Sequence, residues 1–329
     1  LKKTREALRE KFGDRVVLTE VRVPPEEMEN APTYYDNPRI VKPFEFFMKL
    51  VSPPKYIEID PSPLLALFFP IFFGIIVGDI GYGLCILGFG LAMKKKFQKV
   101  EWMQQLMNIM IISSFPTIFF GFLFGEFFGD FGEHIGLLHP VHFLGITWNR
   151  VEAMIPLLVL AIAIGVIHIF VGLSIGILNA YARHQKKHLC EKAGMMGVVL
   201  GIILLILTFV KVLPSFMMIV SAIILVAFLP LLVYGGGTMG VIEVMSTIGN
   251  ILSYARIMAI GMASVILAMV ANELGGAIGV LVAGIVIAVL LHALNIILAM
   301  FSPSLHSVRL HIVEFYSKFY EGGGTEYRP

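Results

Sequence analysis

The chain has 329 residues, of which 57% are hydrophobic and 15% charged, with a mean hydropathy of +0.84 and a net charge of +2. Because soluble proteins carry about 25% charged residues, this composition predicts an all-α protein that crosses a membrane repeatedly. The apolar runs are continuous rather than alternating, which excludes a transmembrane β-barrel. The near-neutral charge excludes nucleic acid as a partner. The sequence has no P-loop and no cysteine motif, so we expect no cofactor and no bound metal.

The beginning of the chain differs in composition from the rest, because residues 1–60 hold nearly half of all the charged residues. Residues 1–36 are predicted to be the stub of a cytoplasmic soluble domain, ending in a helix, a strand and a linker. Residues 37–61 mix aromatic residues with Lys and Glu, which is typical of an interfacial segment. We expect a membrane domain at 62–320 and a cytoplasmic tail at 321–329. With neither an initiator methionine nor a signal peptide, the chain is interpreted as the C-terminal part of a longer protein.

Hydropathy gives seven apolar stretches, at about 63–93, 103–129, 152–182, 193–212, 215–234, 238–272 and 277–318. The first is interrupted by GDIGYG at 78–83, and such a cluster of glycines with an aspartate favours a turn over a helix interior. A single span and a hairpin of two short helices, at about 62–78 and 82–97, are the alternatives.

The distribution of lysine and arginine decides between these alternatives, because basic loops stay in the cytoplasm. Basic residues gather in two loops, at 94–99 and 183–192, whereas the loop at 130–150 carries Asp130 and Glu133. Eight transmembrane helices place both termini in the cytoplasm and Asp79 at the outer end of a short first hairpin. The protein is therefore expected to be a multi-pass cell-membrane protein. Its last two helices are long, so they should be strongly tilted or bent.

Arg256 lies in the middle of an apolar span whose nearest flanking charges are Glu243 and Glu273. At about 1.5 Å per helical residue, these charges are roughly 20 and 25 Å away. A guanidinium at bilayer mid-depth costs at least about 2.5–3.5 kcal/mol and does not deprotonate. Such a residue must face protein or water, which makes an intramembrane ion site the leading hypothesis. The alternative is an arginine that pairs structurally or snorkels.

Two stripes of polar residues accompany this arginine. Glu243, Ser246, Thr247 and Asn250 share one face of a helix, which Ser253 extends toward Arg256. The last span carries a second stripe, formed by His292, Asn295, Ser302, His306 and Arg309. Histidine titrates near neutrality, so this face is suited to relaying protons. Small polar residues also join membrane helices, which is the alternative interpretation of both stripes.

Three further polar residues lie in or beside apolar segments. Asp79 either stands at the outer mouth of a pathway or serves the turn in which it lies. Glu126 is interpreted as capping the outer surface, and His168 as a packing residue.

The segments SYARIMAIGMAS around Arg256 and HSVRLHIVEFYSKFYEGGG around Arg309 resemble the paired arginine signatures of rotary ATPases. The resemblance is to the membrane stator subunit of V-type and A-type enzymes, called subunit a or subunit I. It covers about residues 32–325. Three further segments resemble the part of the family's sequence that enters the membrane. They are PTYYDNP, YIEIDPSP and FFGIIVGDIGYG.

This resemblance implies a non-catalytic ion-translocating subunit beside a rotating proteolipid ring, each ring subunit bearing one membrane carboxylate. Two offset half-channels would pass H⁺ or Na⁺ to and from that carboxylate. Arg256 would attract the ionised carboxylate and oppose direct leakage between the half-channels. The expected partners are the ring, the central-stalk subunits, the peripheral-stalk subunits through an N-terminal arm, and the lipid bilayer.

Site residues follow from matching positions. Arg256 matches the family's essential arginine and Arg309 its second one, while Ser302 and His306 fall at polar positions of the last helix. The cytoplasmic half-channel is assigned Glu243 and Asn250, and the outer one Asp79, His292 and Asn295.

This sequence departs from the eukaryotic pattern at two positions of the outer route. Ala299 stands where eukaryotic members have a glutamate, and Ser264 stands where they have a histidine. His292 and Asn295 are interpreted as substitutes. A secondary transporter or channel that binds an anionic substrate at Arg256 is the alternative function, although no inverted repeat supports it. A purely structural assembly subunit is a third hypothesis.

Overall fold

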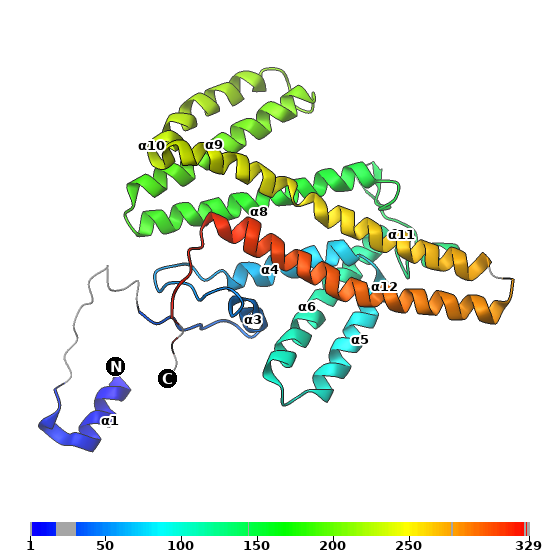
Figure 1. The fold of residues 1–329 in the computed structure, drawn as a ribbon, viewed down its shortest axis with the longest axis horizontal. Helices are drawn as coiled ribbons and strands as arrows, with labels where there is room; N and C mark the ends of the chain where they lie inside the picture. Colours follow the sequence, from blue (N-terminus) through cyan, green and yellow to red (C-terminus); the bar gives the residue numbers. More distant parts are fainter. Residues whose placement is uncertain (1, 18–30, 144, 278, 326, 328–329) are drawn as a thin grey trace.

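The computed structural model describes residues 2–17, 31–143, 145–277, 279–325 and 327 (Figure 1). Its α-helices are α1 (Lys2–Phe12), α3 (Glu45–Met48), α4 (Ser62–Val77), α5 (Ile80–Lys96), α6 (Glu101–Phe124), α7 (Phe131–His134), α8 (Met154–Ala182), α9 (Lys186–Phe209), α10 (Met217–Leu252), α11 (Ala255–Ala277) and α12 (Leu281–Arg309). Short 3-10 turns lie at η1 (Gly13–Arg15), η2 (Lys42–Phe44) and η4 (Tyr316–Lys318), and a π-helix, η3, at Leu310–Phe315. Strands β1 (His142–Phe143) and β2 (Ile146–Thr147) pair as an antiparallel hairpin. The strand expected near residues 16–20 falls partly outside the described residues.

The predicted all-α membrane class is confirmed. Among the described residues, five helical stretches are long and apolar enough to cross a membrane, at 101–124, 154–182, 186–209, 217–277 and 281–318. The apolar helix α4 is shorter. Eight spans, and the division of the chain into domains, stay predictions.

The turn between α4 and α5 lies where the sequence predicts it. Gly78 ends α4 in the left-handed conformation, with φ +46°, and its N–H donates to the carbonyl of Gly74. Asp79 then caps α5, because its side chain accepts a hydrogen bond from the N–H of Tyr82. A glycine and an aspartate at these two positions thus end one helix and begin the next within two residues.

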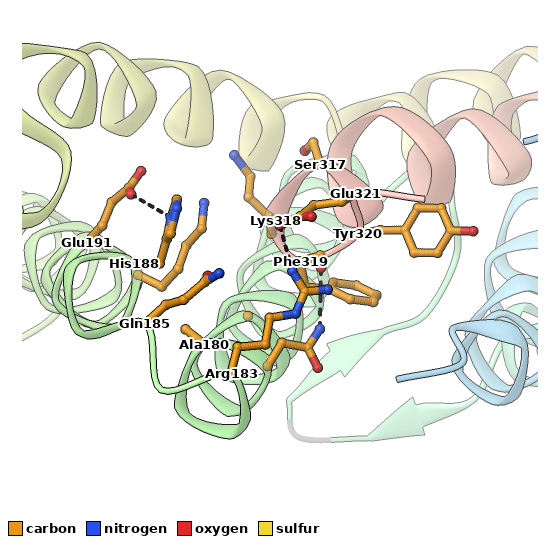
Figure 2. Close-up of a pocket in the computed structure, with 13 residues that line it drawn as sticks. Ala180, Arg183, Gln185, His188, Glu191, Ser317, Lys318, Phe319, Tyr320 and Glu321 are labelled. Atoms are coloured by element: carbon orange, nitrogen blue, oxygen red, sulfur yellow. Dashed lines mark hydrogen bonds and ion pairs between the residues drawn. The ribbon is translucent and has the colours of Figure 1, made fainter. Parts of the chain in front are cut away.

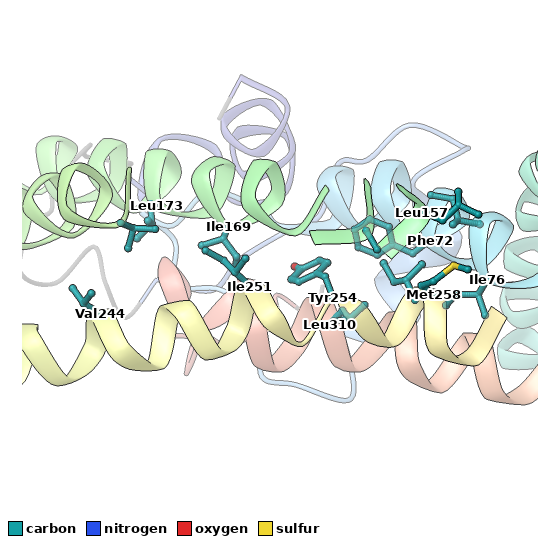
Figure 3. Close-up of a cluster of buried hydrophobic side chains, with 14 of the residues drawn as sticks. Phe72, Ile76, Leu157, Ile169, Leu173, Val244, Ile251, Tyr254, Met258 and Leu310 are labelled. Atoms are coloured by element: carbon teal, nitrogen blue, oxygen red, sulfur yellow. The ribbon is translucent and has the colours of Figure 1, made fainter. Parts of the chain in front are cut away.

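The largest hydrophobic core lies where α4, α8, α10 and α11 meet (Figure 3). The ring of Phe72 from α4 packs against that of Tyr254, with centroids 5.8 Å apart, while Ile76 from α4 lies beside Met258 from α11 and Ile169 from α8 lies beside Ile251 from α10. Tyr254 is fully buried, and its hydroxyl lies 2.7 Å from Nδ1 of His168. These contacts fit the packing role predicted for His168.

Gly165 allows α8 to approach Tyr254 closely. A Cβ at residue 165 would lie 2.6 Å from the Tyr254 ring, whereas a Cβ at Gly88 on α5 would meet nothing within 4 Å. We expect Gly165→Ala to destabilise the protein by about 1–3 kcal/mol through overpacking. The matched control Gly88→Ala should instead be neutral or stabilise it by up to about 1 kcal/mol. Thermal unfolding of the purified protein measures both, and equal melting temperatures would contradict this packing.

The helical stretch that carries Arg256 is interrupted within the predicted span over 238–272. α10 has a non-helical residue at Gly237 and ends at Leu252, and α11 starts at Ala255. At the break, the N–H of Arg256 donates to the carbonyl of Ser253, and that of Ile257 to Tyr254. This tighter i→i−3 turn directs Tyr254 into the core and places Arg256 at the beginning of α11. α11 and α12 then run side by side across the molecule (Figure 1).

Candidate functional site

Arg256 is paired with a carboxylate that the sequence analysis did not select. Its Nη1 atom lies 3.6 Å from Oε1 of Glu314, whose side chain is only 3% exposed, while that of Arg256 is 22% exposed. Glu314 belongs to the π-helix that follows α12, and π-helical turns often occur at functional sites. Within the described part of the chain, neither Nη1 of Arg256 nor Oε2 of Glu314 makes a hydrogen bond. The ion pair is thus loose, and the guanidinium keeps donors free.

Arg309 and His306 surround the same buried carboxylate. Both Arg256 and Arg309 are close enough to interact electrostatically with Glu314 and with His306. Arg309 is exposed, and His306 is partly exposed. The structure therefore brings together three of the predicted site residues, and it adds Glu314 as their counter-ion. One carboxylate does not neutralise two guanidinium groups, so the cluster keeps a net positive charge.

Two lysine side chains bind the polar stripe that leads to Arg256 from the predicted cytoplasmic side. Nζ of Lys192 lies 3.0 Å from Oε1 of Glu243. Lys318, only 2% exposed, donates a 2.8 Å hydrogen bond to Oγ1 of Thr247. With its amide turned to suit its neighbours, Asn250 accepts from the same ammonium group at 3.2 Å. Glu243 and Asn250 thus belong to one network, but two lysines that sequence reasoning did not select complete it.

A cavity of about 160 Å³ borders this network (Figure 2). Its lining includes Asn179, Arg183, His188, Glu191, Lys192 and Lys318. Basic side chains from the α8–α9 connection and the first turns of α9 thus meet the C-terminal end of the last span. The cavity borders the network at the predicted cytoplasmic end of the molecule, where the sequence analysis places the basic loops at 94–99 and 183–192.

Hydrogen bonds and ion pairs connect the segment after Lys318 to the residues that precede α4. The carboxylate of Glu58 accepts from the N–H groups of Glu321 and Gly322, and it pairs with Arg183 at 3.3 Å. Glu321 pairs with Lys55 at 2.9 Å and with Arg183 at 3.0 Å. Burial acts to raise the pKa of Glu321, but hydrogen bonds from Lys55 and Arg183 outweigh it and lower that pKa. These contacts hold the end of the last span, and with it Lys318, in place.

At the opposite end, Asp79 serves the turn between α4 and α5. It is 2% exposed, and its carboxylate accepts from the N–H groups of Tyr82, Phe128 and Gly129 at 2.9, 3.1 and 2.6 Å. Three backbone donors satisfy the charge and attach the segment after α6 to the hairpin. Of the two interpretations of Asp79, these contacts support the turn, and its part in an ion path stays a prediction.

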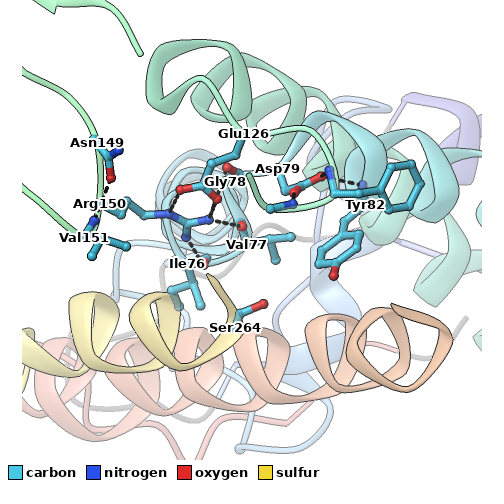
Figure 4. Close-up of polar contacts among 12 residues, drawn as sticks. Ile76, Val77, Gly78, Asp79, Tyr82, Glu126, Asn149, Arg150, Val151 and Ser264 are labelled. Atoms are coloured by element: carbon cyan, nitrogen blue, oxygen red, sulfur yellow. Dashed lines mark hydrogen bonds and ion pairs between the residues drawn. The ribbon is translucent and has the colours of Figure 1, made fainter. Parts of the chain in front are cut away.

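Arg150 and Glu126 form a buried ion pair that sequence reasoning missed (Figure 4). Arg150 is 2% exposed, its Nε donates to Glu126 at 2.7 Å, and Nη2 donates to the second carboxylate oxygen. The same guanidinium donates to the carbonyls of Ile76 and Val77 at 2.9 Å. Glu126 thus lies inside the protein instead of capping its outer surface. A signal was available, because Arg150 is the only formal cation of an otherwise acidic loop.

His292 and Asn295 lie in a network that reaches α5 and α11. Oη of Tyr82 lies 2.8 Å from both Nδ1 of His292 and Nδ2 of Asn295. Oγ of Ser264 donates to Oδ1 of Asn295 at 3.3 Å. Ser302 is one turn of helix beyond Ala299, and both line a cavity of about 170 Å³ together with Ser264 and Asn295. The structure therefore links His292 to Asn295 through Tyr82, and Asn295 to Ser302 through a shared cavity.

Comparisons with known proteins agree with the signatures around the two arginines. The family model described as the V-type ATPase 116kDa subunit family matches residues 1–136 and 238–329. A-type ATP synthase subunit I of Archaeoglobus fulgidus is 35% identical over 92% of this chain and 54% of its own length. The protein of that name from Methanocaldococcus jannaschii is 32% identical over 98% of this chain and 52% of its own.

A bacterial relative, V-type ATP synthase subunit I of Chlamydia pneumoniae, is 26% identical over 94% of this chain. The chain spans about half the length of the curated relatives that it matches. The matched ranges contain Arg256, Arg309 and Glu314, around which the site is built. From the family model and the archaeal relatives together, this chain belongs to the V-type ATPase 116kDa subunit family.

Proposed function

We propose that this chain is the membrane part of a rotary ATPase stator subunit, which passes ions to and from the carboxylates of a rotating proteolipid ring. The relatives are named A-type ATP synthase subunit I, which supports a non-catalytic membrane subunit of such a complex. The observation that carries the proposal is the position of Arg256. It lies between two polar networks that belong to opposite ends of the helices.

Among the residues that the structure describes, the two networks have no side chain in common. One contains Glu243, Asn250 and Lys318 and opens to the cavity beside Arg183. The other contains Ser264, Asn295 and His292. At about 1.5 Å per residue, Arg256 lies roughly 9 Å beyond Asn250 and roughly 12 Å before Ser264. This spacing supports two offset half-channels with a fixed cation between them.

The pairing of Arg256 with Glu314 suits this role. An arginine fully engaged by a buried carboxylate would have no capacity to attract another one. The pair is 3.6 Å long and the Arg256 side chain is 22% exposed, so the guanidinium can still reach a ring carboxylate that passes. Arg309 adds a second positive charge near Glu314, so the cluster attracts an additional anion. The same positive charge opposes a cation that crosses directly between the networks.

The proposal includes an orientation in which both termini are cytoplasmic and the connection between α6 and α8 lies outside. Leu137 on that connection is 60% exposed, and Lys186 begins α9 on the other side. After replacement of Cys85 and Cys190 by serine, Leu137→Cys should react with an impermeant maleimide from outside intact cells. Lys186→Cys should react only after the cells are opened. The reverse pattern would overturn the orientation.

The functional proposal is tested by replacing Arg256 in the complete complex and measuring ATP-driven ion transport in liposomes. Loss of transport with an intact complex supports the stator. Loss of assembly alone would favour a purely structural subunit, and transport without any ring subunit would favour the secondary-transporter alternative. The expected partners are the ring, the stalk subunits and the bilayer.

A further inference from the structure

The irregular turn that follows α12 places Glu314 beside two arginines. In an α-helix, residues five apart lie about 140° from each other around the axis. In a π-helix, backbone hydrogen bonds join residues i and i+5, so residues five apart approach one another. Residues 310–315 are π-helical, which brings Glu314 near Arg309, the last residue of α12. The same turn directs the carboxylate of Glu314 toward Arg256 on α11.

The pair of Arg256 and Glu314 differs from a buried pair elsewhere in the chain. Arg150 is 2% exposed and donates to both carboxylate oxygens of Glu126, with its Nε at 2.7 Å. Arg256 instead approaches Glu314 at 3.6 Å, between Nη1 and Oε1. Its Nη1 is buried, so the 22% exposure of the Arg256 side chain belongs to its other atoms. Arg256 therefore faces an internal carboxylate with one nitrogen and keeps part of its side chain at the surface.

The neighbours of Glu314 determine the charge of the site. The charged and titratable residues around it, on the elements packed against its turn, are Arg256 of α11, Arg309 and His306 of α12, His311 of the π-helix, Lys318 of the next turn, His168 of α8 and Tyr254 between α10 and α11. Arg256 and Arg309 interact electrostatically with the carboxylate, whereas Lys318 is hydrogen-bonded elsewhere. Two guanidinium charges and one carboxylate charge leave one net positive charge.

We propose that Glu314 is an internal counter-ion with which a passing ring carboxylate competes for Arg256, and that it sets how readily the ring carboxylate reloads its ion. The inference rests on the proposed function. It makes Glu314 a positioning residue, because it acts through Arg256. When no ionised ring carboxylate is opposite, Glu314 holds the guanidinium. When one passes, it shares the positive charge with Glu314. No bond to Glu314 forms or breaks, because it acts as a fixed charge.

The direction of the effect follows from the charges. A positive cluster favours the ionised form of a ring carboxylate, and the negative charge of Glu314 weakens that preference. Loading of H⁺ or Na⁺ onto the ring must overcome the same preference. Without Glu314, two uncompensated guanidinium charges would hold the ionised carboxylate, so reloading would require a higher concentration of the ion. Glu314 thus limits the attraction that Arg256 exerts and helps the ring to leave the stator.

The decisive variant is Glu314→Gln, which keeps the shape of the side chain and removes its charge. ATP-driven transport is measured in liposomes that contain the complete complex, while the concentration of H⁺ or Na⁺ is varied on the side to which ATP is added. We expect the concentration for half-maximal transport to rise about tenfold, which is about one pH unit for H⁺. Glu101→Gln, at the exposed start of α6, is the matched control and should leave this midpoint unchanged. His306 is present in every variant, so its own titration cancels in the comparison.

Two further variants separate charge from structure. Glu314→Asp retains the negative charge and should keep the midpoint close to that of the unaltered complex. Arg309→Gln combined with Glu314→Gln leaves the same net charge as the unaltered cluster. The midpoint should therefore return, although two side chains have been changed. A merely structural role predicts the opposite, because the double variant would be more disrupted than the single one.

An unchanged midpoint in Glu314→Gln would overturn the inference, and so would a double variant that keeps the midpoint of the single one. If Glu314→Gln does not assemble, Arg309→Gln replaces it. Loss of one cation should then move the midpoint to a lower concentration, and an unmoved midpoint would overturn the inference. Arg256→Ala in the same assay separates the two proposals. Full transport by Arg256→Ala contradicts the stator itself, whereas loss of transport by Arg256→Ala with an unmoved midpoint in Glu314→Gln contradicts the role of Glu314 alone.

Discussion

Replacement of Arg256 by alanine should abolish ATP-driven ion transport, to below about one hundredth of the normal rate, while the complex still assembles. In the proposed mechanism the guanidinium attracts an ionised ring carboxylate in a low-dielectric region, and alanine would leave that carboxylate uncompensated. The side chain is not a structural centre, because it is 22% exposed and its ion pair with Glu314 is long. Transport is measured in liposomes that contain the complete complex, and assembly is measured by co-purification.

Arg256→Lys distinguishes charge from geometry at this position. Lysine keeps the positive charge but loses the planar fork that can bond a carboxylate with two N–H groups. We expect transport to fall at least about tenfold in this variant as well. Lys99→Ala removes the same charge from the exposed loop after α5 and should pump normally. An Arg256→Ala complex that pumps at the normal rate would exclude the stator mechanism.

Replacement of Arg150 by methionine should destabilise the protein by about 3–5 kcal/mol, the largest stability effect that we expect. The substitution leaves the buried carboxylate of Glu126 without its cation and removes the donors from the carbonyls of Ile76 and Val77. Those carbonyls end α4, so the turn that carries Asp79 loses its support. Thermal unfolding of the purified subunit measures the change.

A double variant tests whether the loss arises from the unpaired charge. Arg150→Met with Glu126→Leu removes both charges, so it should recover part of the stability lost in the single variant. Recovery should be incomplete, because the carbonyls of α4 remain without their donors. A single Arg150→Met variant as stable as the unaltered protein would contradict the assigned ion pair. Arg5→Met on the exposed helix α1 serves as the control and should change stability by less than about 0.5 kcal/mol.

The sequence by itself determined the all-α membrane class, the turn between the first two membrane helices and the central arginine. In the lipid core no water is available to bond the backbone, so each long apolar run must form its backbone hydrogen bonds within itself. Such continuous runs therefore become helices regardless of tertiary context. The turn at Gly78 and Asp79 was predictable because glycine and aspartate end and begin helices through local geometry. Arg256 was identifiable because its desolvation cost depends only on depth, which the flanking apolar residues already define.

Only the tertiary structure decided which groups pair with these residues. Glu314 approaches Arg256 because the chain becomes π-helical after α12, and a helical periodicity does not reveal such a turn. The break before Arg256 results from burial of Tyr254 against α8, a contact between segments distant in sequence. The pair of Arg150 with Glu126 was not predictable for the same reason, since the two residues are 24 positions apart in the sequence and meet only through the fold. Spacing along one helix specifies a shared face, whereas partners across helices depend on how the helices pack.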